Sequence, residues 1–212
     1  SMIWLMKPCF LLVLLSLHIA AAPAQKAVRD SVDGEIPSLL KLYQHLHANP
    51  EISFQEEKTG QRLGAEMKKL GFEVTQNVGG FGVVCVLKNG EGPTVLVRTD
   101  TDALPVKEAT GLPFASIRTT TDDLGKTVPT MHACAHDVSM TCWNGVARVL
   151  TQLKREWEGT LVFIAQPAEE RGAGAKAMLA DGLFKKFPVP DYCLALHVSA
   201  DQPAGTLGYT SG

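Results

Sequence analysis

Residues 131–137, Met-His-Ala-Cys-Ala-His-Asp, form the densest group of potential metal ligands in the chain. They supply a thiol, two imidazoles and a carboxylate directly ahead of a predicted helix. We predict that Cys134 and His136 bind metal, because a soft thiolate and an imidazole two residues apart suit zinc-type sites. The alternative is a disulfide to Cys142, but that residue falls inside the predicted helix, where the required geometry is difficult to reach.

Two adjacent glutamates, Glu169 and Glu170, follow the apolar run at residues 160–165. Adjacent side chains diverge in a turn, so one carboxylate can hold a metal while the other accepts a proton from water. Metal-assisted hydrolysis requires this division of roles. The simpler interpretation is that both glutamates are solvated and stabilise the start of the following helix.

Asp100, Asp102 and His197 also follow apolar, strand-like runs. Residues two apart on an extended chain face the same side, so one aspartate could bind metal while the other orients a ligand. A turn capped by the same two aspartates is an equally good interpretation. His197 alone is more often a buried, hydrogen-bonded histidine than a ligand. His45 and His47 suit the end of a helix, and we predict no chemistry for them.

The elements expected to position these residues alternate between helices and strands. Hydrophobic periodicity predicts helices at residues 36–48, with Pro37 in the first turn, and at 56–70, 137–157 and 173–186. Apolar runs predict strands at residues 82–88, 94–99, 160–165 and 192–198. The Asn-Gly-Glu-Gly-Pro cluster between the first two strands is typical of a hairpin loop.

The order of elements in the second half of the chain predicts parallel strand pairing with right-handed crossovers. We therefore predict an α/β fold with a central, mostly parallel sheet flanked by helices. Open sheets of this kind place their sites beyond the carboxyl ends of strands, which is where the polar residues described above occur.

Residues 1–24 are predicted to be a signal peptide. Lys7 precedes a short apolar run, and a small-residue stretch ends at Ala24. The run is shorter than the ~20 residues of a membrane-spanning helix, so we expect no stable membrane anchor. The expectation is a secreted or periplasmic protein whose residues 25–212 form one domain.

The charge balance of the chain gives no reason to expect a nucleic-acid partner with its phosphate backbone. The formal net charge is −2, from 20 basic and 22 acidic residues without runs of one sign, so we expect no nucleic acid. In an oxidising compartment the cysteines would ordinarily form one or two disulfides. Cys85 and Cys193 lie in apolar, strand-like runs and are predicted to be buried core thiols.

Five motifs occur in order along the chain: LHANPE at residues 46–51, RTDTDALP at 98–105, MHACAHD at 131–137, QPAEE at 166–170 and LHV at 196–198. Together they resemble the aminoacylase and hippurate hydrolase branch of peptidase family M20. That branch includes hydrolases of auxin–amino acid conjugates and N-acetyl-diaminopimelate deacetylases. The resemblance covers about residues 36–212.

The resemblance implies a zinc-exopeptidase-like catalytic domain with two divalent metal ions. These would be zinc or manganese, with cobalt and nickel as alternatives. It implies metal ligation by Cys134, His136, Glu170 and His197, a general base at Glu169, and supporting roles for Asp100 and Asp102.

Family members also carry a lid domain that forms part of the substrate pocket and pairs subunits, followed by one more histidine ligand. Neither follows here, so we expect residues 25–212 to be an incomplete catalytic domain that hydrolyses substrate poorly alone. The full-length form is expected to be a homodimer through its lid. Two residues depart from the family's Cys-Gly-His-Asp-x-His: Ala135 replaces glycine and Ser139 replaces histidine. Ala135 would be strained if the loop needs a positive φ.

The leading hypothesis is hydrolysis of a small N-acyl amino acid. Two metals would polarise the amide carbonyl and lower the pKa of a bound water, and Glu169 would remove its proton. The alternative enzyme is a dipeptidase or carboxypeptidase on the same site. The alternative outside the enzyme class is an inactive metal-binding fragment.

Overall fold

The computed structural model describes residues 9–209. In chain order the elements are α1 (Cys9–His47), α2 (Glu57–Lys69), β1 (Glu73–Thr75), β2 (Val83–Asn89), β3 (Thr94–Asp100), β4 (Thr119–Thr121), β5 (Thr127–Pro129), α3 (His136–Gln152), β6 (Gly159–Gln166), α4 (Gly174–Ala180), α5 (Leu183–Lys186) and β7 (Tyr192–Ala195). A short 3₁₀ turn at Lys154–Glu156 joins α3 to β6.

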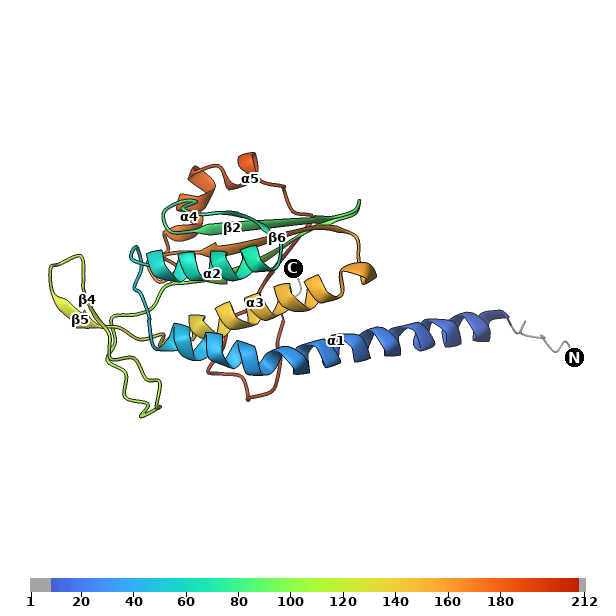
Figure 1. The fold of residues 1–212 in the computed structure, drawn as a ribbon, viewed down its shortest axis with the longest axis horizontal. Coiled ribbons are helices and arrows are strands. Elements are labelled where there is room, and N and C mark those ends of the chain that lie inside the picture. The colour runs from blue at the N-terminus through green and yellow to red at the C-terminus, as the bar shows by residue number, and fades with distance from the viewer. Residues whose placement is uncertain (1–8, 210–212) are drawn as a thin grey trace, which may run out of the picture.

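The central sheet has the strand order β1-β2-β6-β3-β7. The β1–β2 and β2–β6 pairings are antiparallel, whereas β6–β3 and β3–β7 are parallel. The predicted α/β class is confirmed, with a mixed sheet whose parallel half contains β3, β6 and β7. The small hairpin of β4 and β5 projects beyond one end of this sheet (Figure 1).

The predicted hairpin between β2 and β3 is wrong, because β6 lies between these strands. Residues 90–93 instead cross the start of β6. The amide of Thr160 donates a hydrogen bond to the Pro93 carbonyl at 3.0 Å. A Cβ at Gly159 would lie only 2.4 Å from that carbonyl oxygen, so the crossing needs glycine there. The turn residues therefore reverse the chain across an intervening strand, so that β2 and β3 run in opposite directions without pairing.

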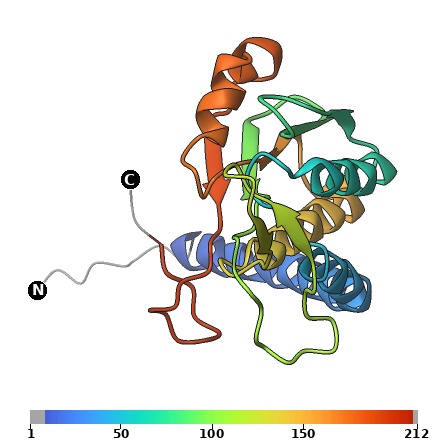
Figure 2. The same cartoon turned by 90° about the vertical axis from the view of Figure 1, so that its left-hand side faces the viewer.

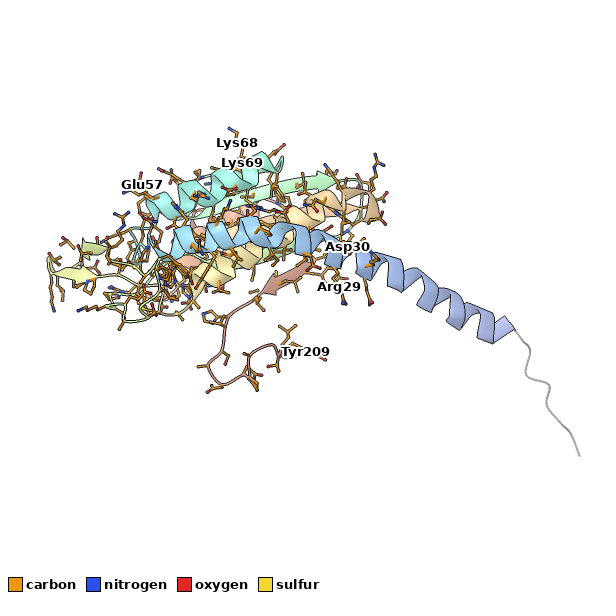
Figure 3. The ribbon with its side chains drawn as sticks, turned by 60° about the horizontal axis from the view of Figure 1, so that its bottom comes forward. Arg29, Asp30, Glu57, Lys68, Lys69 and Tyr209 are labelled. Atoms are coloured by element: carbon orange, nitrogen blue, oxygen red, sulfur yellow. The ribbon has the colours of Figure 1, made fainter. Side chains whose placement is uncertain are left out.

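The two faces of the sheet are covered by different helices: α1, α2 and α3 lie on one side, and α4 and α5 on the other (Figures 1 and 2). Alternate residues of a strand point to opposite faces. Cys85 and Phe163 accordingly join the core beneath α2 and α3, whereas Val84 and Val162 join the core beneath α4 and α5. On α2, Glu57, Lys68 and Lys69 lie on the outer, exposed side (Figure 3).

Two helix predictions need correction. The first helix ends at His47 as predicted, but it extends back through Pro37 to Cys9. Glu35 on the preceding turn accepts hydrogen bonds from Arg148 at 2.9 Å and Gln152 at 2.6 Å, which hold that turn against α3. The helix predicted at residues 173–186 is divided at Gly182, whose φ of 91° ends α4 and begins α5.

Of the predicted signal peptide, residues 1–8 lie outside the described residues, and residues 9–24 form the start of α1. Among residues 9–209, no helix combines the length and the apolar character needed to cross a membrane.

Cys85, Cys134, Cys142 and Cys193 are free thiols. Cys85 is fully buried, as predicted, but the prediction of a buried Cys193 is wrong. Cys193 is exposed because β7 pairs only with β3 and forms the edge of the sheet in the described residues. Cys134 and Cys142 are not joined to each other.

Candidate metal centre

The predicted site residues meet beyond the carboxyl ends of β3 and β6, beside the first turn of α3. The parallel register pairs Asp100 with Gln166, so the segments that follow both strands emerge at the same edge. The indole nitrogen of Trp143 donates a hydrogen bond to the Val97 carbonyl at 3.1 Å, which ties α3 to β3. This tie places the start of α3 at the edge where the strands end.

Three soft or borderline ligand atoms converge at this edge. The Nε2 atoms of His136 and His197 lie 3.3 Å apart, and the Cys134 sulfur lies 3.5 Å from His197 Nε2. All three atoms lie within 4.8 Å of one another. A thiol and two imidazoles in this arrangement suit a zinc-type ion.

Carboxylates face the same imidazole from the other side. His136 Nε2 lies 3.5 Å from Asp100 Oδ2, and 3.8 Å from both Glu169 Oε2 and Glu170 Oε1. Asp100, His136 and Glu169 also form a group whose ligand atoms lie within 4.8 Å of one another. His136 therefore belongs to two potential ligand groups.

Unsatisfied buried oxygens show that this centre fits a cation. Both carboxylate oxygens of Asp100 and Oε1 of Glu170 are buried without a hydrogen-bond donor. Buried carboxylates without partners are costly, and a metal ion would remove that cost. Arg98 supplies one nearby positive charge, 3.1 Å from Asp100 Oδ2. The donor set fits a divalent metal bound by His136 Nε2, with further thiol, imidazole and carboxylate donors close by.

Asp102 orients the site through hydrogen bonds. Its carboxylate accepts hydrogen bonds from the Ser53 hydroxyl at 2.6 Å and from the Glu170 amide at 3.0 Å. Its backbone carbonyl lies 2.7 Å from His136 Nδ1. A carbonyl can only accept, so Nδ1 carries the proton and Nε2 is left free to bind metal. These contacts support the predicted supporting role of Asp102.

Ala135 adopts the left-handed conformation that the loop requires, with φ of 57°. Glycine tolerates this region freely, whereas an L-residue with a Cβ pays about 1–2 kcal/mol. The Ala135 carbonyl accepts hydrogen bonds from the Val138 and Ser139 amides, which begin α3. The strained backbone at Ala135 therefore allows α3 to begin at His136.

His47 makes contacts that we did not predict from the sequence. Its Nδ1 lies 2.6 Å from Asp137, and its Nε2 lies 2.8 Å from Glu108. Burial disfavours charge on His47, but the hydrogen bonds that it donates to both carboxylates outweigh burial and raise its pKa. The His47 imidazole thus links the end of α1 to Asp137, which follows His136 in the chain.

Glu56 is a second residue whose role was missed. Its side chain is fully buried, and Oε1 accepts a hydrogen bond from the Ala168 amide at 2.7 Å. Ala168 has φ of 46°, so the turn that leads into Glu169 and Glu170 has an unusual backbone conformation. Burial raises the pKa of Glu56 to about 7, although the Ala168 amide opposes this rise. Glu56 therefore holds the turn that presents both glutamates.

Removing the Glu56 carboxyl group should loosen that turn. We expect Glu56→Ala to lower the free energy of unfolding by about 1–3 kcal/mol, because the Ala168 amide loses its buried acceptor. Glu56→Gln keeps an acceptor oxygen and should retain most of the stability. Thermal unfolding of the two variants, with exposed Glu57→Ala as the control, measures the difference. Equal loss in the Ala and Gln variants would contradict the acceptor role.

The metal-free ligands are expected to be protonated at neutral pH. Burial and the nearby Glu170 carboxylate raise the pKa of the Cys134 thiol to about 11. Burial disfavours charge on His136, but the hydrogen bond to Asp102 and the charge of Asp100 raise its pKa to about 9. Both groups must lose a proton before they can bind metal.

Zinc binding at pH 7.5 should therefore release about two protons, and the apparent affinity should rise by up to ~100-fold per pH unit below about pH 9. Calorimetric titration in two buffers of different ionisation enthalpy counts these protons. Cys134→Ser should reduce the count by about one, because a serine hydroxyl stays protonated in both states. A heat of binding that does not depend on the buffer would show that these ligands are not protonated in the free protein.

Known proteins resemble this chain over most of its length. Residues 96–212 match the model of Peptidase family M20/M25/M40. The chain is similar to a hippurate hydrolase from Campylobacter jejuni, with 39% identity over 158 residues that cover 74% of this chain and 38% of the relative. It is also similar to an N-acetylcysteine deacetylase from Bacillus subtilis, with 36% identity over 176 residues that cover 82% of this chain and 43% of the relative.

A solved structure shows the same fold. The crystal structure of a dinuclear metal-binding peptidase of the M20 family from Bacillus subtilis superposes with a TM-score of 0.72 and 35% sequence identity. The match covers 83% of this chain and 47% of that chain. The chain thus spans less than half the length of the relatives it matches.

Proposed function

Because the chain belongs to Peptidase family M20/M25/M40, we propose that it carries the metal site of an amidohydrolase that cleaves the amide bond of N-acyl amino acids. The observation that carries this proposal is the convergence of the Cys134, His136 and His197 ligand atoms beside Glu169 and Glu170. Hippurate and N-acetylcysteine, which appear in the relatives' names, are both amino acids acylated on nitrogen. Their shared chemistry supports this substrate class.

Cys134, His136, Glu170 and His197 would hold the metals, and Asp100 lies close enough to contribute. Bound metal ions of this kind polarise a carbonyl group and lower the pKa of water. Zinc suits the thiol and imidazoles, and manganese suits the carboxylates.

Glu169 is the proposed general base. Its side chain is 37% exposed, against 19% for Glu170, so Glu169 is the more accessible carboxylate beside His136. It would accept a proton from the water that attacks the amide carbon and return that proton to the leaving nitrogen. The carbon–nitrogen bond breaks, and a carboxylic acid and a free amine are formed.

Substrate comparison tests the proposal. The purified protein, loaded with zinc or manganese, is assayed with N-acyl amino acids and with dipeptides of the same carboxyl-terminal residue. Faster, chelator-sensitive release of amine from the N-acyl amino acids supports the proposal. Preferential cleavage of the dipeptides would favour a peptidase instead. Because residues 25–212 alone are expected to hydrolyse substrate poorly, absence of hydrolysis contradicts the proposal when the full-length, metal-loaded protein is assayed.

A further inference from the structure

A pocket of about 490 Å³ lies beside Glu170, between the loop after β3 and the tip of the β4–β5 hairpin. We propose that this pocket receives the acyl group of the substrate and prefers an apolar or aromatic group, with Leu124 at the hairpin tip as its outer wall. The proposal rests on the function proposed above and adds a substrate preference to it.

The pocket reaches the metal centre at its inner end. Ser53, Ala103 and Glu170 line it. All three adjoin Asp102: Ser53 and the Glu170 amide donate hydrogen bonds to its carboxylate, and Ala103 follows it in the chain. A substrate whose amide carbonyl lies next to Glu170 would therefore have one substituent directed along this pocket.

The pocket walls favour an apolar group. Half of the ten lining residues are apolar, namely Ile52, Ala103, Leu104, Pro105 and Leu124. Pockets that bind apolar groups combine such walls with a few polar residues that fix orientation. The substrate's acyl group meets this description better than its carboxylate does.

The charged residues at the rim are already paired. Arg171, the cation of this lining, lies 3.0 Å from Asp123 and also contacts the Phe54 ring, 5.9 Å from its centroid. Asp122 accepts hydrogen bonds from the amides of Leu124 and Lys126 within its own turn. With one cation, Arg171, against the carboxylates of Asp122, Asp123 and Glu170, the charge of the lining disfavours a substrate carboxylate.

Strand β4 is held more firmly than the hairpin tip that follows it. Gln55 donates a hydrogen bond to the Thr121 carbonyl at 2.9 Å and accepts one from the Thr120 hydroxyl at 2.5 Å. At the tip, both partners of the Arg171–Asp123 ion pair are about half exposed, and such pairs contribute little. Leu124 is 91% exposed and would lose contact with water against a bound acyl group. The tip can thus adjust to the group that enters.

The test compares Leu124→Ser with Ile117→Ser. Leu124 and Ile117 are both large, apolar residues, 91% and 93% exposed to solvent respectively, but Ile117 does not line the pocket. In the full-length, metal-loaded protein, kcat/KM is measured for N-benzoylglycine and N-acetylglycine. We expect Leu124→Ser to lower kcat/KM for the benzoyl substrate about tenfold and for the acetyl substrate less than twofold, because hydrophobic pockets discriminate by this order. Ile117→Ser should leave the ratio unchanged.

Binding of benzoate, measured by calorimetry, separates this proposal from the function. Weaker benzoate binding in Leu124→Ser but not in Ile117→Ser supports the pocket even if the unmodified protein hydrolyses neither substrate, in which case only the proposed function fails. If the unmodified protein hydrolyses both substrates and Leu124→Ser changes neither their ratio nor benzoate binding, the pocket assignment is overturned.

Discussion

Replacing Glu169 by glutamine in the full-length, metal-loaded protein should lower kcat by about 10²–10⁴-fold, the usual contribution of general-base catalysis, while the metal content stays unchanged. Glutamine keeps the size and hydrogen-bonding capacity of glutamate but cannot accept a proton at neutral pH. The partial exposure of Glu169 beside His136 places its carboxylate where water can reach it. Steady-state kinetics and metal analysis of the same preparation measure the two quantities.

Glu170→Gln is the matched variant, one residue along the same turn. The Oε1 atom of Glu170 is buried without a hydrogen-bond donor, so we expect the negatively charged Glu170 carboxylate to bind metal. A neutral amide is a weaker ligand, and we expect metal content to fall together with activity, with partial recovery in excess metal. If Glu169→Gln loses metal while Glu170→Gln retains it, the two roles are reversed. If both keep full metal and turnover, hydrolysis occurs elsewhere.

Replacing His136 by alanine should remove the metal that its Nε2 binds, because this atom lies within reach of the thiol, the second imidazole and the Asp100 carboxylate. We expect the bound metal to fall by one ion per chain at micromolar concentration, and activity to be lost with it. Metal analysis after gel filtration gives the stoichiometry.

Exposed His45 is the control, since it lies on α1 outside both ligand groups, and His45→Ala should keep the full metal content. His136 is fully buried, so circular dichroism must show that the alanine variant is folded. Should that variant unfold, His136→Gln fills the same space and gives the same metal readout. Retention of two ions by a folded His136 variant would remove this residue from the ligand set.

Much of the site could be predicted from the sequence, because residues that follow parallel strands meet at one edge. Asp100, His136, Glu169 and His197 lie within reach of one another for this reason. The ligand assignments and the identity of the base remain predictions.

The supporting contacts could not be predicted, since they join residues far apart in the chain. Glu56 and Ala168 are separated by 112 positions, and His47 and Asp137 by 90. Nothing in the local pattern around Glu56 or His47 indicates the partner. The order of the strands was missed for a similar reason: glycines at residues 90 and 92 suit a hairpin and a strand crossing equally well.

His197 follows β7, the strand at the edge of the sheet, and its imidazole is exposed. The proposed ligand His136 is fully buried, whereas the position of His197 depends on β7. A metal bound by His197 would therefore help to hold β7 in place, and any contact that orders β7 would tighten metal binding by the same free energy. Metal affinity would thus report on whatever packs against this strand.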